Sequence, residues 1–342
     1  MSRRLLASTA ALAAVVLVAL LAQTLVAGQT PSPATNATTV GKAWTPARTL
    51  DGKPDLQGIW TDNTLTPLER PKSLGAKEFY TDQEIAELTK RARQGNVGEE
   101  GDLGAARQQA VRYDLELYGF DPTKLRFAST KRTSLIVGPE GVVPPMLPAA
   151  KERNVERAAQ DKGHEFDSYA NRPLSERCLM GQERIPMLPG ANEGNLLQIV
   201  QGPGYVALLG EQNHSTRIIP TDGRPHVPQN IRLWQGDSVG HWEGNTLVVD
   251  TTNFTNLTAF RGSSEKLHLV ERFTRGADDT MIYGFTVEDP ATWAKPWTAE
   301  IPWTKTKGPV YEWACHEGNS MISTILRGAR VAEAEAAQKK GK

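Results

Sequence analysis

Two acidic residues lie within apolar, strand-like segments of the sequence. Because side chains alternate along a strand, Asp250 shares a face with Val248 and Phe254. By the same rule, Glu271 shares a face with Leu269. If these faces point inward, both carboxylates enter the interior, where a charge must be paired or neutralised. We therefore expect Asp250 and Glu271 to lie close together inside the sheet, with an arginine or a histidine within reach.

Two interpretations of these carboxylates stay open. In the first, they form an internal salt bridge with an arginine such as Arg217 or Arg232. In the second, they are the polar anchor of a cavity and serve ligand binding or general acid–base chemistry. The catalytic candidates are then Asp250, Glu271, His226 and His241.

The histidines, of which there are six, also raise the question of a metal site. His226, His241 and His316 could be brought together by the fold, but their spacing is not diagnostic of a metal site. The consecutive residues Cys315, His316 and Glu317 cannot converge on one ion from a strand, where neighbours point to opposite faces. We predict neither a bound metal nor an organic cofactor, and we interpret the histidines as polar residues at the rim of the sheet.

Aromatic residues crowd into residues 293–313. Trp297 and Trp303 share strand parity with Ile301, which marks that face as apolar. The face forms either the core or the aromatic wall of a ligand cavity, which a barrel of about eight strands can enclose. For a cavity, the candidate ligand-binding residues are Arg217, Trp242, Tyr283, Trp297 and Trp303.

The sequence lacks a convincing signature of a known catalytic class. It contains neither the phosphate-binding Gly-x-x-x-x-Gly-Lys nor the metalloprotease His-Glu-x-x-His. Residues 236–240 carry the letters of a nucleophile elbow around Ser238. A functional elbow lies between a strand and a helix, whereas this stretch is rich in turn residues. We therefore interpret Ser238 as a turn residue that bonds to nearby backbone.

Short β-type runs separated by turn residues dominate the second half of the chain. Runs at intervals of roughly 8–12 residues are typical of a barrel or a sandwich, and the links are too short for parallel crossovers. We predict a mainly β fold, an antiparallel up-and-down barrel of lipocalin type, with a two-sheet sandwich as the alternative. The predicted strands are 58–60, 133–137, 196–201, 205–210, 216–220, 241–242, 246–254, 267–274, 281–287, 298–304 and 310–315.

The irregular first half of the chain contains two expected helices. Thr81 and Glu84 have the spacing of a capping box, which predicts a helix over residues 82–93. A second short helix is expected over residues 149–161. The predicted plan of the whole chain is a signal peptide (1–28), a flexible linker (29–43), an irregular region wrapped against the sheet (44–194), an antiparallel β domain (195–325) and a helical or disordered tail (326–342).

The first residues have the features of a targeting segment. Arg3 and Arg4 precede the apolar run 5–27, whose last residues are small and suit cleavage. The alternative is an uncleaved anchor, since about 20 apolar residues span a bilayer. Both alternatives predict a periplasmic or extracellular protein. In such an oxidising compartment, we expect the only two cysteines, Cys178 and Cys315, to form a disulfide.

The charge balance narrows the expected partners. The chain has 39 lysine and arginine residues and 39 aspartate and glutamate residues. A neutral chain has no bulk attraction for nucleic acid or for an anionic membrane surface. The expected partner is therefore a small molecule, and no feature of the sequence predicts the oligomeric state.

Four stretches of the sequence are distinctive, PDLQGIW (54–60), DGRPH (222–226), WQGDSVGHWEGNTLVVDT (234–251) and ACHEGN (314–319). Together they resemble a family of uncharacterised secreted bacterial proteins. The resemblance extends over nearly the whole chain after the targeting segment. It implies secretion, and it supplies no activity and no catalytic residues.

Two classes of function follow from these observations. The first is a secreted protein that binds a small, largely apolar molecule in a β-barrel cavity. The second is an enzyme without a cofactor, a lyase, an isomerase or a hydrolase, which uses interior carboxylates and a histidine as acid and base. Carboxylates that reach a pocket together with a histidine would favour the enzyme, and a dry cavity with every charge paired would favour the binding protein.

Overall fold

The computed structural model describes most of the chain after residue 43. The described residues are 44–93, 126–180, 185–189, 196–211, 215–258, 260–318 and 320–340. The chain from Trp44 to Lys342 forms one compact unit. The predicted signal peptide (1–28) and linker (29–43) lie outside the described residues. Among the helices that are described, none combines the length and the apolar character that a membrane span requires.

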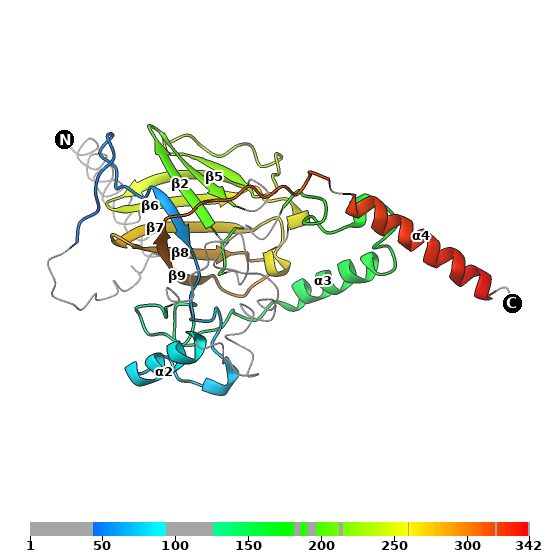
Figure 1. Cartoon of the computed structure of the whole chain (residues 1–342), viewed down its shortest axis with the longest axis horizontal. Helices are drawn as coiled ribbons and strands as arrows, with labels where there is room; N and C mark the ends of the chain where they lie inside the picture. The colour runs from blue at the N-terminus through cyan, green and yellow to red at the C-terminus, as the bar shows by residue number, and fades with distance from the viewer. Residues whose placement is uncertain are drawn as a thin grey trace, which may run out of the picture. The chain divides into compact units, whose positions relative to one another are not determined.

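Nine strands form a single antiparallel sheet, in which β6 to β9 lie side by side (Figure 1). The strands are β1 (Gly58–Thr61), β2 (Leu196–Gly202), β3 (Tyr205–Gly210), β4 (Thr216–Pro220), β5 (Asp237–Glu243), β6 (Thr246–Thr252), β7 (His268–Ala277), β8 (Thr280–Glu288) and β9 (Trp297–Thr306). Their order across the sheet is β4-β3-β2-β1-β9-β8-β7-β6-β5. The prediction of a mainly β, antiparallel up-and-down fold is confirmed.

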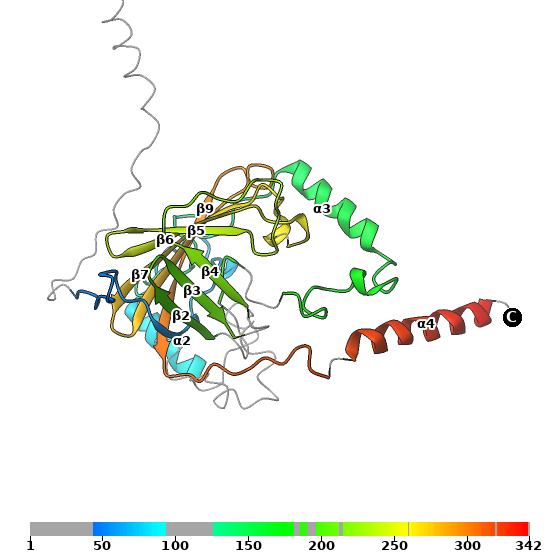
Figure 2. The same cartoon turned by 90° about the horizontal axis from the view of Figure 1, so that it is seen from above.

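The sheet is not closed into a barrel. Its edge strands β4 and β5 share no ladder of backbone hydrogen bonds within the described residues. The two edges nevertheless come close, since a Cβ atom added to Gly240 in β5 would lie 2.9 Å from Cγ2 of Ile219 in β4. Figure 2 shows β2, β3 and β4 running at an angle to β5 and β6. The lipocalin-like barrel and the two-sheet sandwich both stay predictions.

Strand β1 lies in the middle of the sheet, although it comes from the irregular first half of the chain. Trp60 is paired with Leu197 of β2 on one side and with Lys305 of β9 on the other. The Trp60 side chain is fully buried, and its indole N–H donates to the carbonyl oxygen of Leu56 at 3.0 Å. The sequence predicted a short strand here, but its place between β2 and β9 depends on partners far along the chain.

One face of the sheet, which we call the inner face, carries the main hydrophobic core. Its largest fully buried side chains include Trp60, Phe273, Tyr283, Phe285 and Trp303. The rings of Tyr283 and Trp303 have centroids 4.8 Å apart. Because side chains alternate along a strand, the residues between these positions lie on the opposite, outer face. On that outer face, β5 to β8 carry many half-exposed polar side chains.

The helices begin where local signals predict them. Helix α2 (Asp82–Arg93) follows a capping box, in which the Thr81 N–H donates to Glu84 Oε2 at 2.8 Å and the Glu84 N–H donates to Thr81 Oγ1 at 3.2 Å. Helix α3 (Pro148–Asp161) starts one residue before the predicted position. Its first residue is proline, which suits this position because the backbone N–H that proline lacks would have no partner within the helix. Both predicted helices are confirmed.

Two segments that we predicted as strands do not form them. Residues 310–315 do not continue the sheet beside β9, because β9 already pairs with β8 on one side and with β1 on the other. Segment 133–137 forms a single bridge, between Ile136 and Ala299 of β9. The chain then turns away at Gly138, whose positive φ of 117° suits only glycine.

The C-terminal helix is longer than expected. Helix α4 (Met321–Lys340) begins before residue 326, where we expected the tail to start. Ile322, Ile325 and Leu326 recur at helical spacing and are partly buried. The prediction missed this helical spacing because it assigned residues up to 325 to the β domain.

The predicted disulfide between Cys178 and Cys315 is confirmed. Their Cα atoms lie 5.8 Å apart, and the bond closes a loop with a sequence separation of 137 residues. It joins the irregular first half of the chain to the segment that follows β9.

Candidate functional site

Four neighbouring strands carry ionisable residues on the outer face of the sheet. Asp250 of β6 lies opposite Val239 of β5 and opposite Val270 of β7. His268 of β7 lies opposite Glu288 of β8. Asp237 at the start of β5 lies opposite Thr252, two positions from Asp250. Asp237, Asp250, His268 and Glu288 thus form a staggered row across β5 to β8.

The Asp250 carboxylate is the centre of this row. Its Oδ1 lies 2.9 Å from Nε2 of His226, and its Oδ2 lies 2.7 Å from Nε2 of His268. Each oxygen of one carboxylate is therefore bound to a different imidazole.

The row continues outward from both histidines. Nδ1 of His226 lies 2.7 Å from Oδ2 of Asp237, and Nδ1 of His268 lies 3.5 Å from Oε2 of Glu288. We call Asp237, His226, Asp250, His268 and Glu288 the histidine–carboxylate network. All five side chains are partly exposed, from 18% for Asp237 to 53% for Glu288.

His226 comes from the loop between β4 and β5, which is fixed to the sheet by its backbone. The Val227 N–H donates to Oδ2 of Asp237 at 3.0 Å. The side-chain amide of Asn253 donates to the carbonyl oxygens of Val227 at 2.9 Å and Pro228 at 3.3 Å. Asn253 has a positive φ of 59°, a conformation that asparagine tolerates better than most residues. The loop therefore holds the His226 ring against Asp250.

The network shifts the titration of its central members. The hydrogen bond to Asp250 raises the pKa of His268 above its ordinary value, and burial opposes this rise only in part. Burial would raise the pKa of Asp250, but the hydrogen bonds and charges of His268 and His226 outweigh it and lower that pKa. The pair is therefore an imidazolium and a carboxylate over a wider range of pH than either group alone.

The two histidines differ in what they can do. Both ring nitrogens of His226 are within 2.9 Å of a carboxylate oxygen. The ring of His268 is held at Nε2, whereas its Nδ1 has only the 3.5 Å contact with Glu288, at the limit of a hydrogen bond. Nδ1 of His268 is therefore the ring atom best placed to exchange a proton with a bound molecule.

The structure does not place Asp250 and Glu271 together. Val249 lies opposite Glu271, so Val249 and Glu271 point to the inner face and Asp250 points to the outer face. The expectation that both carboxylates are interior was wrong for Asp250. The prediction failed because of Val248, which is only 4% exposed although it lies on the outer face. Apolar neighbours on both faces of β6 hid the direction of the strand.

Glu271 lies in the inner face as part of a salt bridge. Its carboxylate is 0% exposed and accepts from Arg217 at 2.6 and 3.0 Å. The Tyr283 hydroxyl donates to Oε1 of Glu271 at 2.8 Å, and burial raises the pKa of Tyr283 well above its ordinary value. This is the internal ion pair with Arg217, one of the two interpretations above. The other arginine, Arg232, donates instead to the carbonyl oxygen of Glu265.

The aromatic candidates belong to the core. Trp297 and Trp303 are buried on the inner face, and Trp242 is partly buried against the same cluster. The indole N–H groups of Trp297 and Trp303 have no hydrogen-bond partner among the described residues. Their role in ligand binding stays a prediction.

His241 and Ser238 lie in β5 but outside the network. His241 is exposed, and its Nε2 lies 3.1 Å from Oε1 of Glu243. Ser238 is buried in the strand, where its hydroxyl bonds to the Thr251 hydroxyl at 2.9 Å, so the turn that we expected there is wrong. Within the part of the chain that the structure describes, no three histidine, cysteine, aspartate or glutamate side chains are arranged to hold a metal ion.

Sequence reasoning missed His268, Asp237 and Glu288. The alternation of β7 contains a usable signal, because His268 and Glu271 are three positions apart and therefore point to opposite faces. Once Asp250 is assigned to the outer face, His268 belongs beside it. The register between β6 and β7 was still needed, and register cannot be derived from one strand.

Comparisons with known proteins add no relative. No protein-family model, no curated protein and no solved structure matches the chain. The resemblance to secreted bacterial proteins stays a prediction.

Proposed function

We propose that this protein is an exported enzyme without a cofactor, in which His268 transfers protons to and from a bound substrate. The observation that carries the proposal is the Asp250 carboxylate, which binds one imidazole with each oxygen at 2.9 and 2.7 Å. A carboxylate that orients a histidine through one ring nitrogen leaves the other nitrogen for chemistry, as in the histidine–aspartate half of a catalytic triad.

The direction of the pKa shift favours a particular role. Because the pKa of His268 is raised, its imidazolium form is more populated at neutral pH than that of an isolated histidine. The imidazolium donates the Nδ1 proton to a leaving oxygen or nitrogen, and the neutral ring takes a proton back from water. The reaction classes served by such a step are hydrolysis, elimination and isomerisation. Glu288, next to Nδ1, is placed to receive or supply that proton.

Chromogenic esters, glycosides and elimination substrates with good and poor leaving groups test this proposal. General acid–base catalysis contributes about 10²–10⁴-fold, so His268→Asn should lower turnover by about that factor. The loss should be greatest for poor leaving groups, which depend most on a proton donor. His241→Asn is the matched control, because His241 lies on the same face outside the network. Equal turnover by the wild type and His268→Asn would exclude His268 as the proton donor.

A chemical probe tests the same atom without a substrate. Diethyl pyrocarbonate acylates a neutral ring nitrogen that solvent can reach. We expect the order of reactivity to be His241, then His268, then His226, because both nitrogens of His226 are engaged. Mass spectrometry of peptides after brief exposure reads this order, and a His226 that reacts faster than His268 contradicts the assignment.

A second candidate function is the binding of a small, largely apolar molecule at the inner face of a barrel-like sheet. It is supported by the buried indole N–H groups of Trp297 and Trp303, which have no partner among the described residues and could donate to a polar atom of the bound molecule. The closeness of Gly240 in β5 to Ile219 in β4 supports the barrel. Native mass spectrometry of protein from its own host tests this candidate, because an apolar molecule should co-purify and be lost on unfolding.

A further inference from the structure

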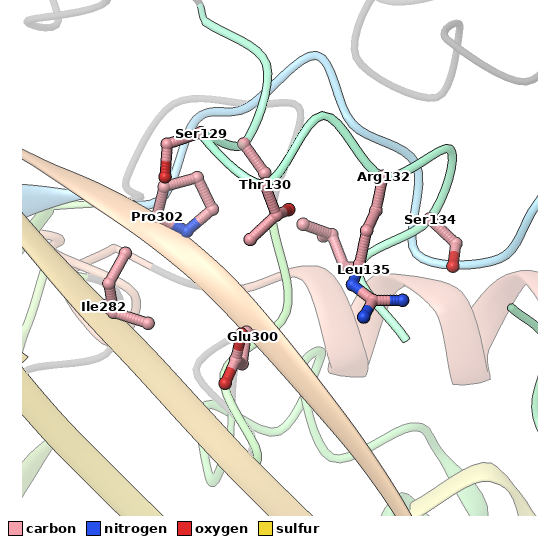
Figure 3. A pocket seen from close by; sticks show the side chains of 9 residues that line it. Ser129, Thr130, Arg132, Ser134, Leu135, Ile282, Glu300 and Pro302 are labelled. Atoms are coloured by element: carbon pink, nitrogen blue, oxygen red, sulfur yellow. The ribbon is translucent and has the colours of Figure 1, made fainter. Parts of the chain in front are cut away.

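A small pocket lies on the outer face of the sheet, away from the histidine–carboxylate network. The segment that carries Ser129, Thr130 and Leu135 lies across strand β9, which contributes Glu300 and Pro302, and Ile282 comes from β8 (Figure 3). The pocket has a volume of about 100 Å³. One water molecule needs at least about 10–15 Å³ of such space, so the pocket has room for several.

The walls of this pocket are fixed by hydrogen bonds. The Glu300 N–H donates to the Leu135 carbonyl oxygen at 2.9 Å, and this bond joins the segment to β9. Behind the wall, the Thr133 hydroxyl donates to the Lys77 carbonyl oxygen at 2.6 Å and accepts from Arg70 Nε at 2.8 Å. Thr133 is fully buried. The pocket is therefore formed without a ligand, which lowers the entropy lost on binding.

The charges around the pocket leave one carboxylate without a cation. Arg132 also lines it, but its guanidinium donates to Glu78 at 2.8 Å and lies over the ring of Phe79 at 5.3 Å. The Glu300 side chain forms no hydrogen bond or ion pair with any described residue. The pocket is thus left with the negative charge of Glu300.

The surroundings of Glu300 define the kind of ligand that fits. The hydroxyls of Ser129 and Thr130 can accept hydrogen bonds, whereas Leu135, Ile282 and Pro302 form an apolar wall. A primary ammonium group has three donors and one positive charge, which matches a carboxylate and two hydroxyls. Its methylene groups can contact the apolar wall.

We propose that this pocket binds the primary ammonium group of a small amine, with Glu300 as its counter-ion. The site does not depend on the proposed acid–base function, because none of its residues belongs to the histidine–carboxylate network. A ligand this small is expected to bind with a dissociation constant in the millimolar range.

Titration of the full chain with ethylamine hydrochloride, followed by NMR, tests this proposal. We expect ethylamine to cause saturable shifts of the signals of Thr130, Leu135 and Ile282. Ethanol and acetate, a neutral and an anionic molecule of similar size, are the controls and should bind more weakly. Glu300→Gln should weaken ethylamine binding by about tenfold or more, the effect of losing one charged hydrogen bond. Glu265→Gln, which removes an equal charge from a loop outside the pocket, should leave the affinity for ethylamine unchanged.

Several results would overturn the proposal. They are the absence of saturable shifts, binding of ethanol or acetate as tight as that of ethylamine, and equal affinity in the wild type and Glu300→Gln. An unchanged spectrum of the Glu300→Gln protein outside the pocket shows that the variant is folded.

Discussion

Two carboxylates on neighbouring strands have opposite environments, although both are bound to basic side chains. Glu271 points to the inner face, is 0% exposed and has the guanidinium of Arg217 and the hydroxyl of Tyr283 as partners. Asp250 points to the outer face, its side chain is 36% exposed, and its partners are two imidazoles. Their strands pair directly, with Val249 opposite Glu271 and Asp250 opposite Val270.

The difference shows that burial and the type of basic partner decide whether a carboxylate stabilises the fold or can exchange protons. A guanidinium keeps its proton at any pH that a protein experiences, so it does not act as a proton donor. An imidazole changes charge near neutral pH, and at a half-exposed site water can carry the proton away. The inner pair can therefore hold the sheet together, and the outer network can exchange protons.

The largest expected effect tests the inner pair. Glu271→Gln leaves the Arg217 guanidinium buried without a counter-charge, and removal of one partner of a buried ion pair costs about 3–5 kcal/mol. Urea unfolding should therefore show a loss of that size in the free energy of unfolding. The double variant Arg217→Met/Glu271→Leu should recover most of the loss, because apolar residues of similar volume replace a buried pair at little cost. A free energy of unfolding of Glu271→Gln within about 1 kcal/mol of the wild type would contradict an ion pair that is shielded from water.

A smaller effect is expected from the central carboxylate of the network. Asp250→Asn removes the charged acceptor that raises the pKa of His268, so that pKa should fall toward 6.5. Loss of these charged hydrogen bonds at a half-exposed site should cost about 1–2 kcal/mol in the free energy of unfolding. NMR of the imidazole nitrogens as a function of pH measures the pKa, with Glu243→Gln as the control outside the network. A His268 pKa that is unchanged in Asp250→Asn would show that the contact is too weak to matter.

The pH dependence of stability should reveal the network. The pKa of His268 is raised above 6.5, so its stabilising contribution is complete below pH 6.5 and disappears as the pH rises through the folded-state value. The pKa of Asp250 is lowered below 3.8, so its contribution is present above pH 3.8 and is lost as the pH falls through the folded-state value.

These directions define one experiment. The gap in the free energy of unfolding between the wild type and His268→Gln should be largest between pH 3.8 and pH 6.5. It should shrink as the pH rises through the folded-state pKa of His268. It should stay below about 1 kcal/mol throughout, because the side chains are partly exposed. A gap that widens as the pH rises above neutrality has the wrong sign for a raised pKa.

The smallest effect is expected at His241. It lies on the same outer face, but it is exposed, and among the described residues its polar side-chain partner is the exposed Glu243. His241→Ala should change the free energy of unfolding by less than about 0.5 kcal/mol, as is usual for surface positions. Thermal unfolding checks this, and a loss of more than about 1 kcal/mol would place His241 in a larger network than the structure describes.

Local signals predicted local structure well. The capping box at Thr81 and Glu84 predicted helix α2, and alternation between turn glycines predicted the bounds of β3 and β4. Strand β5 was predicted too short, because Gly236, Ser238 and Gly240 have the composition of a turn. Gly236 does lie outside the strand, with a positive φ of 69°. Ser238 and Gly240 fit the strand through partners elsewhere, because Ser238 bonds to Thr251 and Gly240 leaves space for Ile219.

The candidate site depended on information that one sequence does not contain. His226 and Asp250 were recognised as residue types suited to acid–base work, and the structure places them 2.9 Å apart. Their joining to His268 required the register of β6 against β7. The inward direction assigned to Asp250 failed because β6 is apolar on both faces, so alternation alone could not identify the core side.

The position of β1 has a consequence for the order of folding. Strands β2–β4 and β5–β9 are each joined by links between sequence neighbours, so each group can form early from local hairpins. Within the described sheet, β1 is the strand that hydrogen-bonds to both groups, through β2 and β9. It is synthesised before either partner, and its last partner is synthesised after every other strand. The first strand made is thus the last to find both neighbours, and a chain that ends before β9 leaves an unpaired edge exposed to aggregation.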